Sequence, residues 1–148
     1  MKGRRGFSLV ELLLVLAIFA IVGGVGFIGL RSLDTRSRVR QAAQQLARQV
    51  DLARSEARRS NGTATIDFVS GTQFTYIDPE GTDHAMRLPA ATRLRDPGSV
   101  AARLAFSGPF GTVDPLKVST TYVIESTRDA SVTSSVSVVG VLGKAYVR

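Results

Sequence analysis

A single carboxylate, Glu11, lies near the start of an apolar run that extends from Leu9 to Leu30. A charged group inside a membrane segment costs on the order of a few kcal/mol and usually has a partner. The run contains no cation. One would arise if the chain were cut just before Phe7, because cleavage would create an α-amine at the head of the helix. The amine of one subunit could then pair with Glu11 of its neighbour. The simpler alternative places Glu11 at the depth of the lipid headgroups.

Other side chains give little support for catalysis. His84 is the only histidine, and its neighbours Asp83 and Ala85 predict an exposed loop. The hydroxyl residues at 119–121 and 131–137 fit the polar faces of strands. The chain has no cysteine, no phosphate-binding loop, no nucleophile elbow and no metal-ligand spacing. We therefore expect no enzymatic activity, no cofactor and no bound metal.

A second candidate lies near the C-terminal end. Lys144, Tyr146 and Arg148 alternate, so on a strand they would share one face. A cation–aromatic–cation row can hold phosphates and stack a base. These three residues are a candidate DNA contact, and the alternative is an ordinary strand with a solvated edge.

The net charge of +7 is concentrated in the N-terminal third. The first six residues contribute +3, Glu11 contributes −1, and residues 31–59 contribute +5 because eight arginines stand against three acidic residues. Residues 60–148 sum to zero, with eight basic and eight acidic side chains. A dedicated nucleic-acid-binding domain would spread positive charge over its folded region. The distribution argues against that class for the chain as a whole.

Residues 12–30 form an uncharged segment that would be about 28 Å long as a helix, close to the thickness of a bilayer core. The apolar part of a secretory signal peptide is shorter and ends in a small-residue cleavage site, which this sequence lacks. We therefore expect a retained membrane anchor. Basic residues flank both ends of the segment, so the charge bias alone leaves its orientation open.

The helical pattern continues through residues 31–61, where apolar residues recur at spacings of three and four. Ser60-Asn61-Gly62 predicts the end of the helix. We expect one continuous helix from about Ser8, membrane-spanning in its first half and amphipathic in its second. The stripe that would pack on a globular head comprises Val39, Ala42, Ala43, Leu46, Val50, Ala53 and Ala57.

Residues 62–148 change to the alternating pattern and turn signals of short strands. Such strands predict an antiparallel sheet or sandwich, with the helical stripe covering one face. The fold class is therefore expected to be α+β. The expected strands lie at 63–69, 72–77, 86–88, 92–95, 103–106, 119–126, 135–139 and 142–147.

The segment Gly6-Phe7-Ser8-Leu9-Val10-Glu11-Leu12, after a short basic leader, resembles the class III signal of type IV pilins and type II secretion pseudopilins. The resemblance implies that a prepilin peptidase cuts between Gly6 and Phe7 and methylates Phe7, and that Glu11 serves filament assembly. It also implies a cleaved leader at 1–6, a transmembrane assembly helix at 7–30, an amphipathic helix at 31–61 and a β-rich head at 62–148. Ile28 stands where many members have proline.

Two C-terminal phrases, RLAFSGPFGTVDP and VSVVGVLGKAYVR, resemble the pseudopilin H/FimT group of minor subunits. The resemblance implies a hetero-oligomeric filament of pilin subunits, assembled from the inner membrane, with a cytoplasmic N-terminus and an extracytoplasmic head. Some FimT-like pilins that act in DNA uptake carry a Gly-Arg-x-Arg element. Gly143-Lys144-Ala145-Tyr146, followed by Arg148, departs from it.

Three functions remain open at this point. The chain could prime or tip a type IV pilus or a type II secretion pseudopilus, in the second case contacting exported protein. It could be a DNA-binding minor pilin for natural transformation. It could also be a membrane-tethered β-domain that never polymerises.

Overall fold

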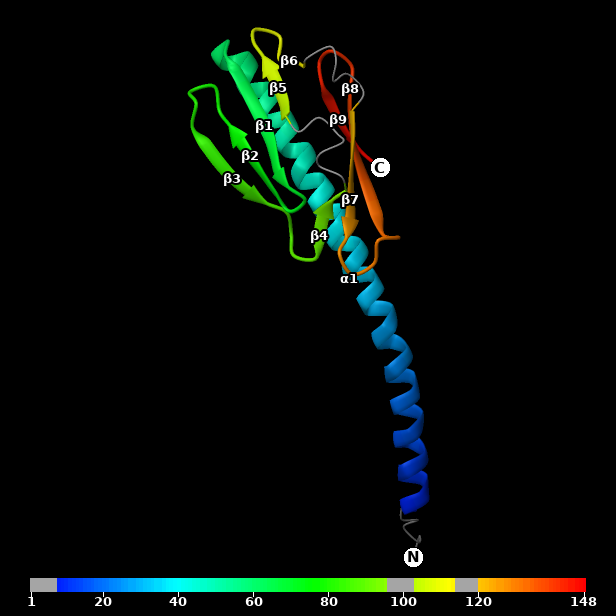
Figure 1. Cartoon of the computed structure of the whole chain (residues 1–148). Coiled ribbons are helices and arrows are strands. Elements are labelled where there is room, and N and C mark those ends of the chain that lie inside the picture. The colour runs from blue at the N-terminus through cyan, green and yellow to red at the C-terminus, as the bar shows by residue number, and fades with distance from the viewer. Residues whose placement is uncertain (1–7, 96–102, 114–119) are drawn as a thin grey trace, which may run out of the picture. The chain divides into compact units, whose positions relative to one another are not determined.

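The computed structural model describes residues 8–95, 103–113 and 120–148, without the side chains of residues 25–31 (Figure 1). A single long helix, α1 (Leu9–Ser60), precedes a series of β-strands. The chain divides into two compact units, Met1–Asp34 and Thr35–Arg148.

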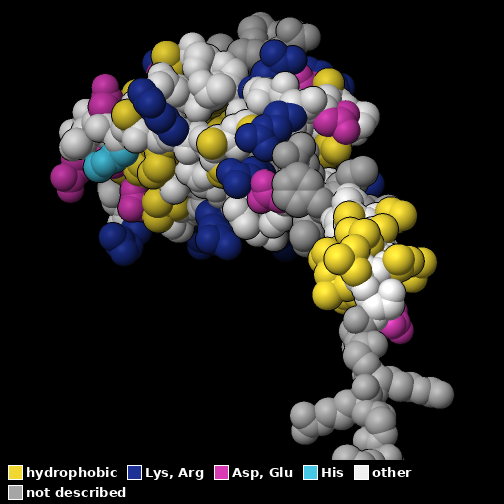
Figure 2. Space-filling view, turned by 90° about the horizontal axis from the view of Figure 1, so that it is seen from below, with side chains coloured by type: hydrophobic (Ala, Val, Ile, Leu, Met, Phe, Trp, Pro, Cys, Tyr) yellow, Lys and Arg dark blue, Asp and Glu magenta, His cyan; other side chains and the backbone are white. Residues whose placement is uncertain are grey.

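In the first unit, the described residues belong to the N-terminal part of α1, and their large apolar side chains are exposed. The exposed fraction runs from 40% at Val15 to 77% at Leu9, and Figure 2 shows these side chains covering the helix surface. Within the residues whose side chains are described, no stretch of helix reaches the length and hydropathy expected of a membrane span.

The second unit contains the rest of α1, and the predicted stripe is its buried face. All seven stripe residues, from Val39 to Ala57, are buried. The helix ends as the sequence predicts. Asn61 adopts a left-handed conformation with φ 54°, and the Gly62 N–H donates to the carbonyl of Ala57 at 3.2 Å. This bond satisfies one of the carbonyls left free at a helix C-terminus.

The strands form two antiparallel sheets, of five strands in the order β3-β2-β1-β5-β6 and four strands in the order β4-β7-β8-β9. One buried cluster joins the stripe of α1 to inward-facing residues of both sheets, and the alanines of the stripe allow close approach. The strands are β1 (Thr63–Ser70), β2 (Gln73–Ile77), β3 (Asp83–Arg87), β4 (Thr92–Leu94), β5 (Arg103–Ser107), β6 (Thr112–Val113), β7 (Thr120–Ser126), β8 (Thr133–Val139) and β9 (Lys144–Val147).

β8 begins two residues earlier and β9 two residues later than predicted, and two other strands differ more. β3 occupies 83–87 rather than 86–88, and β6 was not predicted. β3 is an edge strand that is exposed at every position except Met86, so it lacks the apolar alternation that marks a half-buried strand. β6 has only two residues and exists because Val113 and Thr112 pair with β5.

Candidate functional site

Glu11 lies in the first turn of α1. The carbonyl of Ser8 accepts hydrogen bonds from the N–H groups of Glu11 and Leu12, at 3.0 and 3.2 Å. The Glu11 side chain is exposed, and it makes no ion pair or hydrogen bond with any residue in the described part of the chain. A carboxylate in the first turn is favoured by the helix dipole. Gly6 and Phe7 lie outside the described residues.

The structure brings the C-terminal row together on one face of β9. The Lys144 Nζ lies 5.3 Å from the centroid of the Tyr146 ring, a cation–π distance. Tyr146 and Arg148 line the same cavity, of about 340 Å³, with Thr121, Ser137 and Val139. The alternate residue Ala145 pairs with Val138, which is buried. The predicted sharing of a face therefore holds for this strand.

His84 lies in β3, so the predicted loop was wrong, although the side chain is about half exposed. Its ring stacks on Tyr76 with centroids 5.6 Å apart, and its Nε2 lies 3.2 Å from Oδ2 of Asp78. The Tyr76 hydroxyl donates to the Glu56 carboxylate, and burial raises the pKa of Tyr76 above its ordinary value of 10.0. Among the described residues, no acidic, histidine or cysteine cluster could hold a metal ion.

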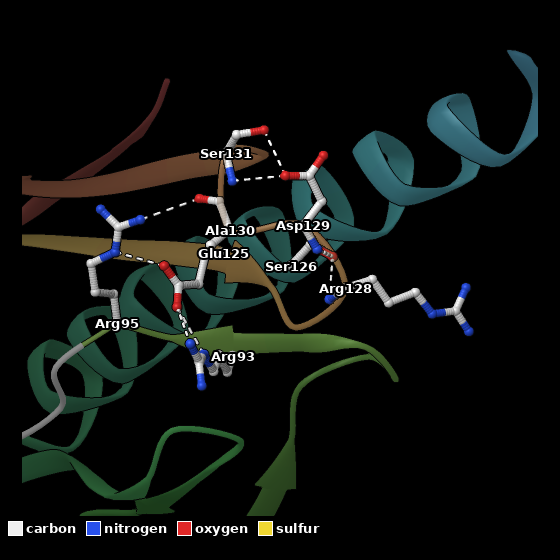
Figure 3. Close-up of polar contacts among 8 residues, drawn as sticks. All are labelled: Arg93, Arg95, Glu125, Ser126, Arg128, Asp129, Ala130 and Ser131. Atoms are coloured by element: carbon white, nitrogen blue, oxygen red, sulfur yellow. Dashed lines mark hydrogen bonds and ion pairs between the residues drawn. The ribbon is translucent and has the colours of Figure 1, made fainter. Parts of the chain in front are cut away.

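A buried carboxylate that the sequence analysis did not single out joins β4 to β7. Glu125 is only 4% exposed, and Figure 3 shows two arginines directed at it. The Arg93 Nε donates to Oε1 at 2.8 Å and the Arg95 Nε donates to Oε2 at 2.6 Å. These contacts, first of Arg95 and then of Arg93, hold the pKa of Glu125 below its ordinary value of 4.5. The pair Arg93-x-Arg95 was a usable signal, because alternate residues of a strand share a face.

Arg95 and side chains of the turn itself also stabilise the turn after β7 (Figure 3). Arg95 also donates to the carbonyl of Ala130 at 3.3 Å. The Asp129 carboxylate accepts hydrogen bonds from both the N–H and the hydroxyl of Ser131, at 3.0 and 2.6 Å. Arg95 therefore links the end of β4 to both β7 and the β7–β8 turn.

We expect the free energy of unfolding to fall as the pH is lowered through about 4.5, with Glu125 contributing to the slope. Because its pKa is lower in the folded state than in the unfolded state, the unfolded chain binds more protons in this range, and acid favours unfolding. Glu125→Gln cannot titrate, so urea unfolding of this variant between about pH 6 and pH 3 should show a shallower loss of stability. Glu80→Gln, at an exposed position of the β2–β3 turn, is the matched control. Equal slopes for the native chain and Glu125→Gln would contradict the prediction.

The phrase FSGPFG contains the end of β5 and the turn that leads to β6. Phe106 is fully buried, and the N–H of Gly108 donates to the carbonyl of Gly62 at 2.8 Å. A Cβ at Gly108 would lie 2.6 Å from the Cα of Asn61 and 2.7 Å from the carbonyl oxygen of Ala57. The glycine is therefore where the turn contacts the end of α1.

Both the N-terminal and the C-terminal parts of the chain are similar to known proteins. Residues 1–27 match the prokaryotic N-terminal methylation motif. Two crystal structures of the type IV minor pilin FimU of Pseudomonas aeruginosa strain PAO1 share the fold. One has a TM-score of 0.56 and 18% identity, covering 76% of this chain and 88% of FimU. The other has a TM-score of 0.55 and 17% identity, covering 73% and 90%. No curated protein sequence matches the chain.

These likenesses confirm the predicted α+β pilin fold. Residues 42–140, more than half of the chain, match the family described as type II transport protein GspH. The chain therefore belongs to the type II transport protein GspH family, within the pilin and pseudopilin superfamily, and is a structural protein rather than an enzyme.

Proposed function

We propose that this chain is a minor pilin or pseudopilin that is made as a membrane-anchored precursor and built into a filament through α1. The observation that carries the proposal is Glu11, a carboxylate without a partner in the described residues, which lies among exposed apolar side chains and within an N-terminal methylation motif. An exposed helix that is apolar on all sides needs an apolar environment outside the chain, such as a bilayer or neighbouring helices. The uncharged segment continues to Leu30 in the sequence.

In this proposal, a prepilin peptidase cuts between Gly6 and Phe7 and methylates the new N-terminus. The new amine can carry a positive charge, which methylation of the nitrogen does not remove. It would form an ion pair with Glu11 of an adjacent subunit. In a single chain each charge would lie unpaired in a low-dielectric environment, which is energetically costly. The ion pair compensates both charges, so this cost favours assembly.

The proposal assigns a role to each part of the chain. Residues 1–6 are the leader on the cytoplasmic side, and residues 7–30 are the anchor in the inner membrane and the assembly helix. Residues 31–61 are the amphipathic helix that supports the head, and residues 62–148 are an extracytoplasmic head that contacts other subunits. Deletion of the gene would distinguish the two filaments. Loss of protein secretion would indicate a pseudopilus, whereas loss of pili and transformation would indicate a pilus.

Mass spectrometry of the N-terminus of the membrane-extracted protein tests the processing. We expect the mature chain to begin at N-methylated Phe7 in cells with prepilin peptidase, and at the intact leader in cells without it. A mature chain that still carries residues 1–6 in peptidase-positive cells would contradict the proposal.

A second candidate function is DNA contact by the C-terminal row, and the Lys144–Tyr146 contact favours it. We expect Lys144→Ala combined with Arg148→Ala to weaken retention of duplex DNA in a gel-shift assay by about tenfold and to flatten its salt dependence, because two phosphate contacts are removed. Arg58→Ala combined with Arg59→Ala removes the same charge from exposed positions at the end of α1 and is the control. Equal retention by both double variants, or no binding by the native chain, would exclude a role for this row.

A further inference from the structure

A basic groove in the second unit shares Arg148 with the C-terminal row and Ser131 with the β7–β8 turn, and it joins them to α1. It has a volume of about 590 Å³ and lies between α1 and the start of β8, beside the end of β9. Arg36, Arg40 and Gln44 line it from α1, while Ser131–Ser134 and Arg148 line it from the other side. Arg36 and Arg40 are four residues apart in a helix, so their side chains extend from the same face.

The three arginines carry positive charge that the described residues do not neutralise by contact. Arg36, Arg40 and Arg148 make no side-chain hydrogen bond or ion pair with the part of the chain that the structure describes. No acidic side chain of the described residues lines the groove. Asp129 is an acidic residue that interacts electrostatically with Arg36. Its pKa is lowered mainly by hydrogen bonds from Ser131 and to a smaller extent by the charge of Arg36.

The lining is apolar as well as cationic. Val39 is buried, and Val132 and Val147 complete an aliphatic part of the groove wall. Serine and threonine at positions 131, 133 and 134 add hydroxyl groups. An anion with an attached aliphatic portion would contact all three kinds of side chain, whereas a bare phosphate would leave Val132 and Val147 in contact with water.

One of the groove's arginines is close to the proposed anchor in the sequence. Arg36 lies six positions after Leu30, the last residue of the uncharged segment. In any backbone conformation six residues span at most about 20 Å, so Arg36 stays within reach of the membrane interface. Arginines near an anionic bilayer surface bind its headgroups.

We propose that the groove lined by Arg36, Arg40 and Arg148 binds the headgroup of an anionic phospholipid, with the phosphate at the arginines and the glycerol ester region against the valines. The inference rests on the proposed membrane anchoring of the chain. The second unit would then contact lipid as well, in addition to the contact that the apolar part of α1 makes with the bilayer.

The test uses the full chain in zwitterionic detergent micelles, with amide chemical shifts of Ser131, Thr133 and Ser134 as the readout. Titration with short-chain phosphatidylglycerol should shift these amides, and short-chain phosphatidylcholine should not. Arg36→Gln combined with Arg40→Gln should weaken phosphatidylglycerol binding by about tenfold or more. Arg58→Gln combined with Arg59→Gln, with the same net charge, should bind like the native chain. Arg40→Gln alone provides the measurement if the double variant is unstable.

Asp129→Asn should change the affinity for phosphatidylglycerol in the opposite direction. It removes the carboxylate that acts on Arg36 while an amide oxygen can still accept from Ser131, so we expect binding a few-fold tighter. Equal shifts with both lipids, or equal weakening in both arginine double variants, would overturn the proposal. Inorganic phosphate binding as tightly as phosphatidylglycerol would reduce the groove to a phosphate site. Tighter binding of a glutamate-rich peptide or of duplex DNA would assign it to a protein or nucleic-acid partner instead.

These outcomes are separate from those of the proposed function. A chain that is cleaved at Gly6–Phe7 and incorporated into filaments, but has no lipid preference at the groove, contradicts the headgroup site alone. A chain that prefers phosphatidylglycerol but keeps its leader contradicts the processing route alone.

Discussion

Glu11→Ala is expected to abolish incorporation of the subunit into filaments while leaving membrane insertion and the fold of the head intact. The variant leaves the Phe7 amine of each neighbour without its proposed carboxylate partner. An unpaired ion in a low-dielectric environment costs on the order of a few kcal/mol, and each 1.4 kcal/mol is about tenfold in an equilibrium constant. We therefore expect incorporation to fall by at least about tenfold, measured as the fraction of the chain in sheared filaments against the fraction in membranes.

The insertion step should respond in the opposite direction. Removing a carboxylate from an apolar helix lowers the cost of placing that helix in a bilayer, so the membrane-bound pool of Glu11→Ala should be equal to or larger than that of the native chain. Glu11→Gln keeps the shape without the charge and should behave like Glu11→Ala, while Glu11→Asp should retain part of the incorporation. Native levels of incorporation for Glu11→Ala would favour a tethered β-domain that does not depend on this pair.

Gly108→Ala is expected to destabilise the head by about 3 kcal/mol, at the upper end of the usual cost of overpacking. The added Cβ would meet Asn61 Cα at 2.6 Å and the Ala57 carbonyl at 2.7 Å, both of them backbone atoms of the end of α1. Such atoms cannot rotate away as the end of a flexible side chain can. The turn would have to move from α1, which would strain the Gly108–Gly62 hydrogen bond and the position of Phe106 in the core.

Thermal unfolding followed by circular dichroism measures this effect, and we expect the midpoint to fall by roughly 10 °C. Gly140→Ala is the control, because Gly140 has φ 75° but no atom within 4 Å of an added Cβ. It carries the backbone penalty of a left-handed residue without the collision, so it should cost about 1 kcal/mol. Equal midpoints for the two variants would show that close approach at Gly108 is not what stabilises this turn.

Local patterns in the sequence were sufficient for much of the fold. The apolar residues of α1 repeat at helical spacing, and the structure buries that stripe from Val39 to Ala57. The stop at Ser60-Asn61-Gly62 depends on a left-handed residue that asparagine adopts more readily than most. The alternation in 63–77 predicted β1 and β2, because hairpin strands are close in sequence as well as in space. The family resemblance arose from the spacing of Gly6, Phe7 and Glu11.

Tertiary structure decided the features that depend on residues distant in sequence. Arg93 and Glu125 are 32 residues apart, and their contact exists only because β4 pairs with β7. Pairing also determines β3 and β6, whose own residues lack a strand pattern. The basic groove brings together Arg36 and Arg148, which lie at opposite ends of the unit in the sequence.

The physical reason is the range of each signal. Periodicity reports which face of a helix or strand is apolar, and it is written in consecutive residues. Which strands become neighbours depends on burial and loop closure summed over the whole unit, and no short segment contains that information. The sequence alone thus determined the long helix, its buried stripe and the N-terminal processing motif. Only the folded second unit placed Glu125 between two arginines and placed Arg36, Arg40 and Arg148 around one groove, because both arrangements join segments that no local pattern connects.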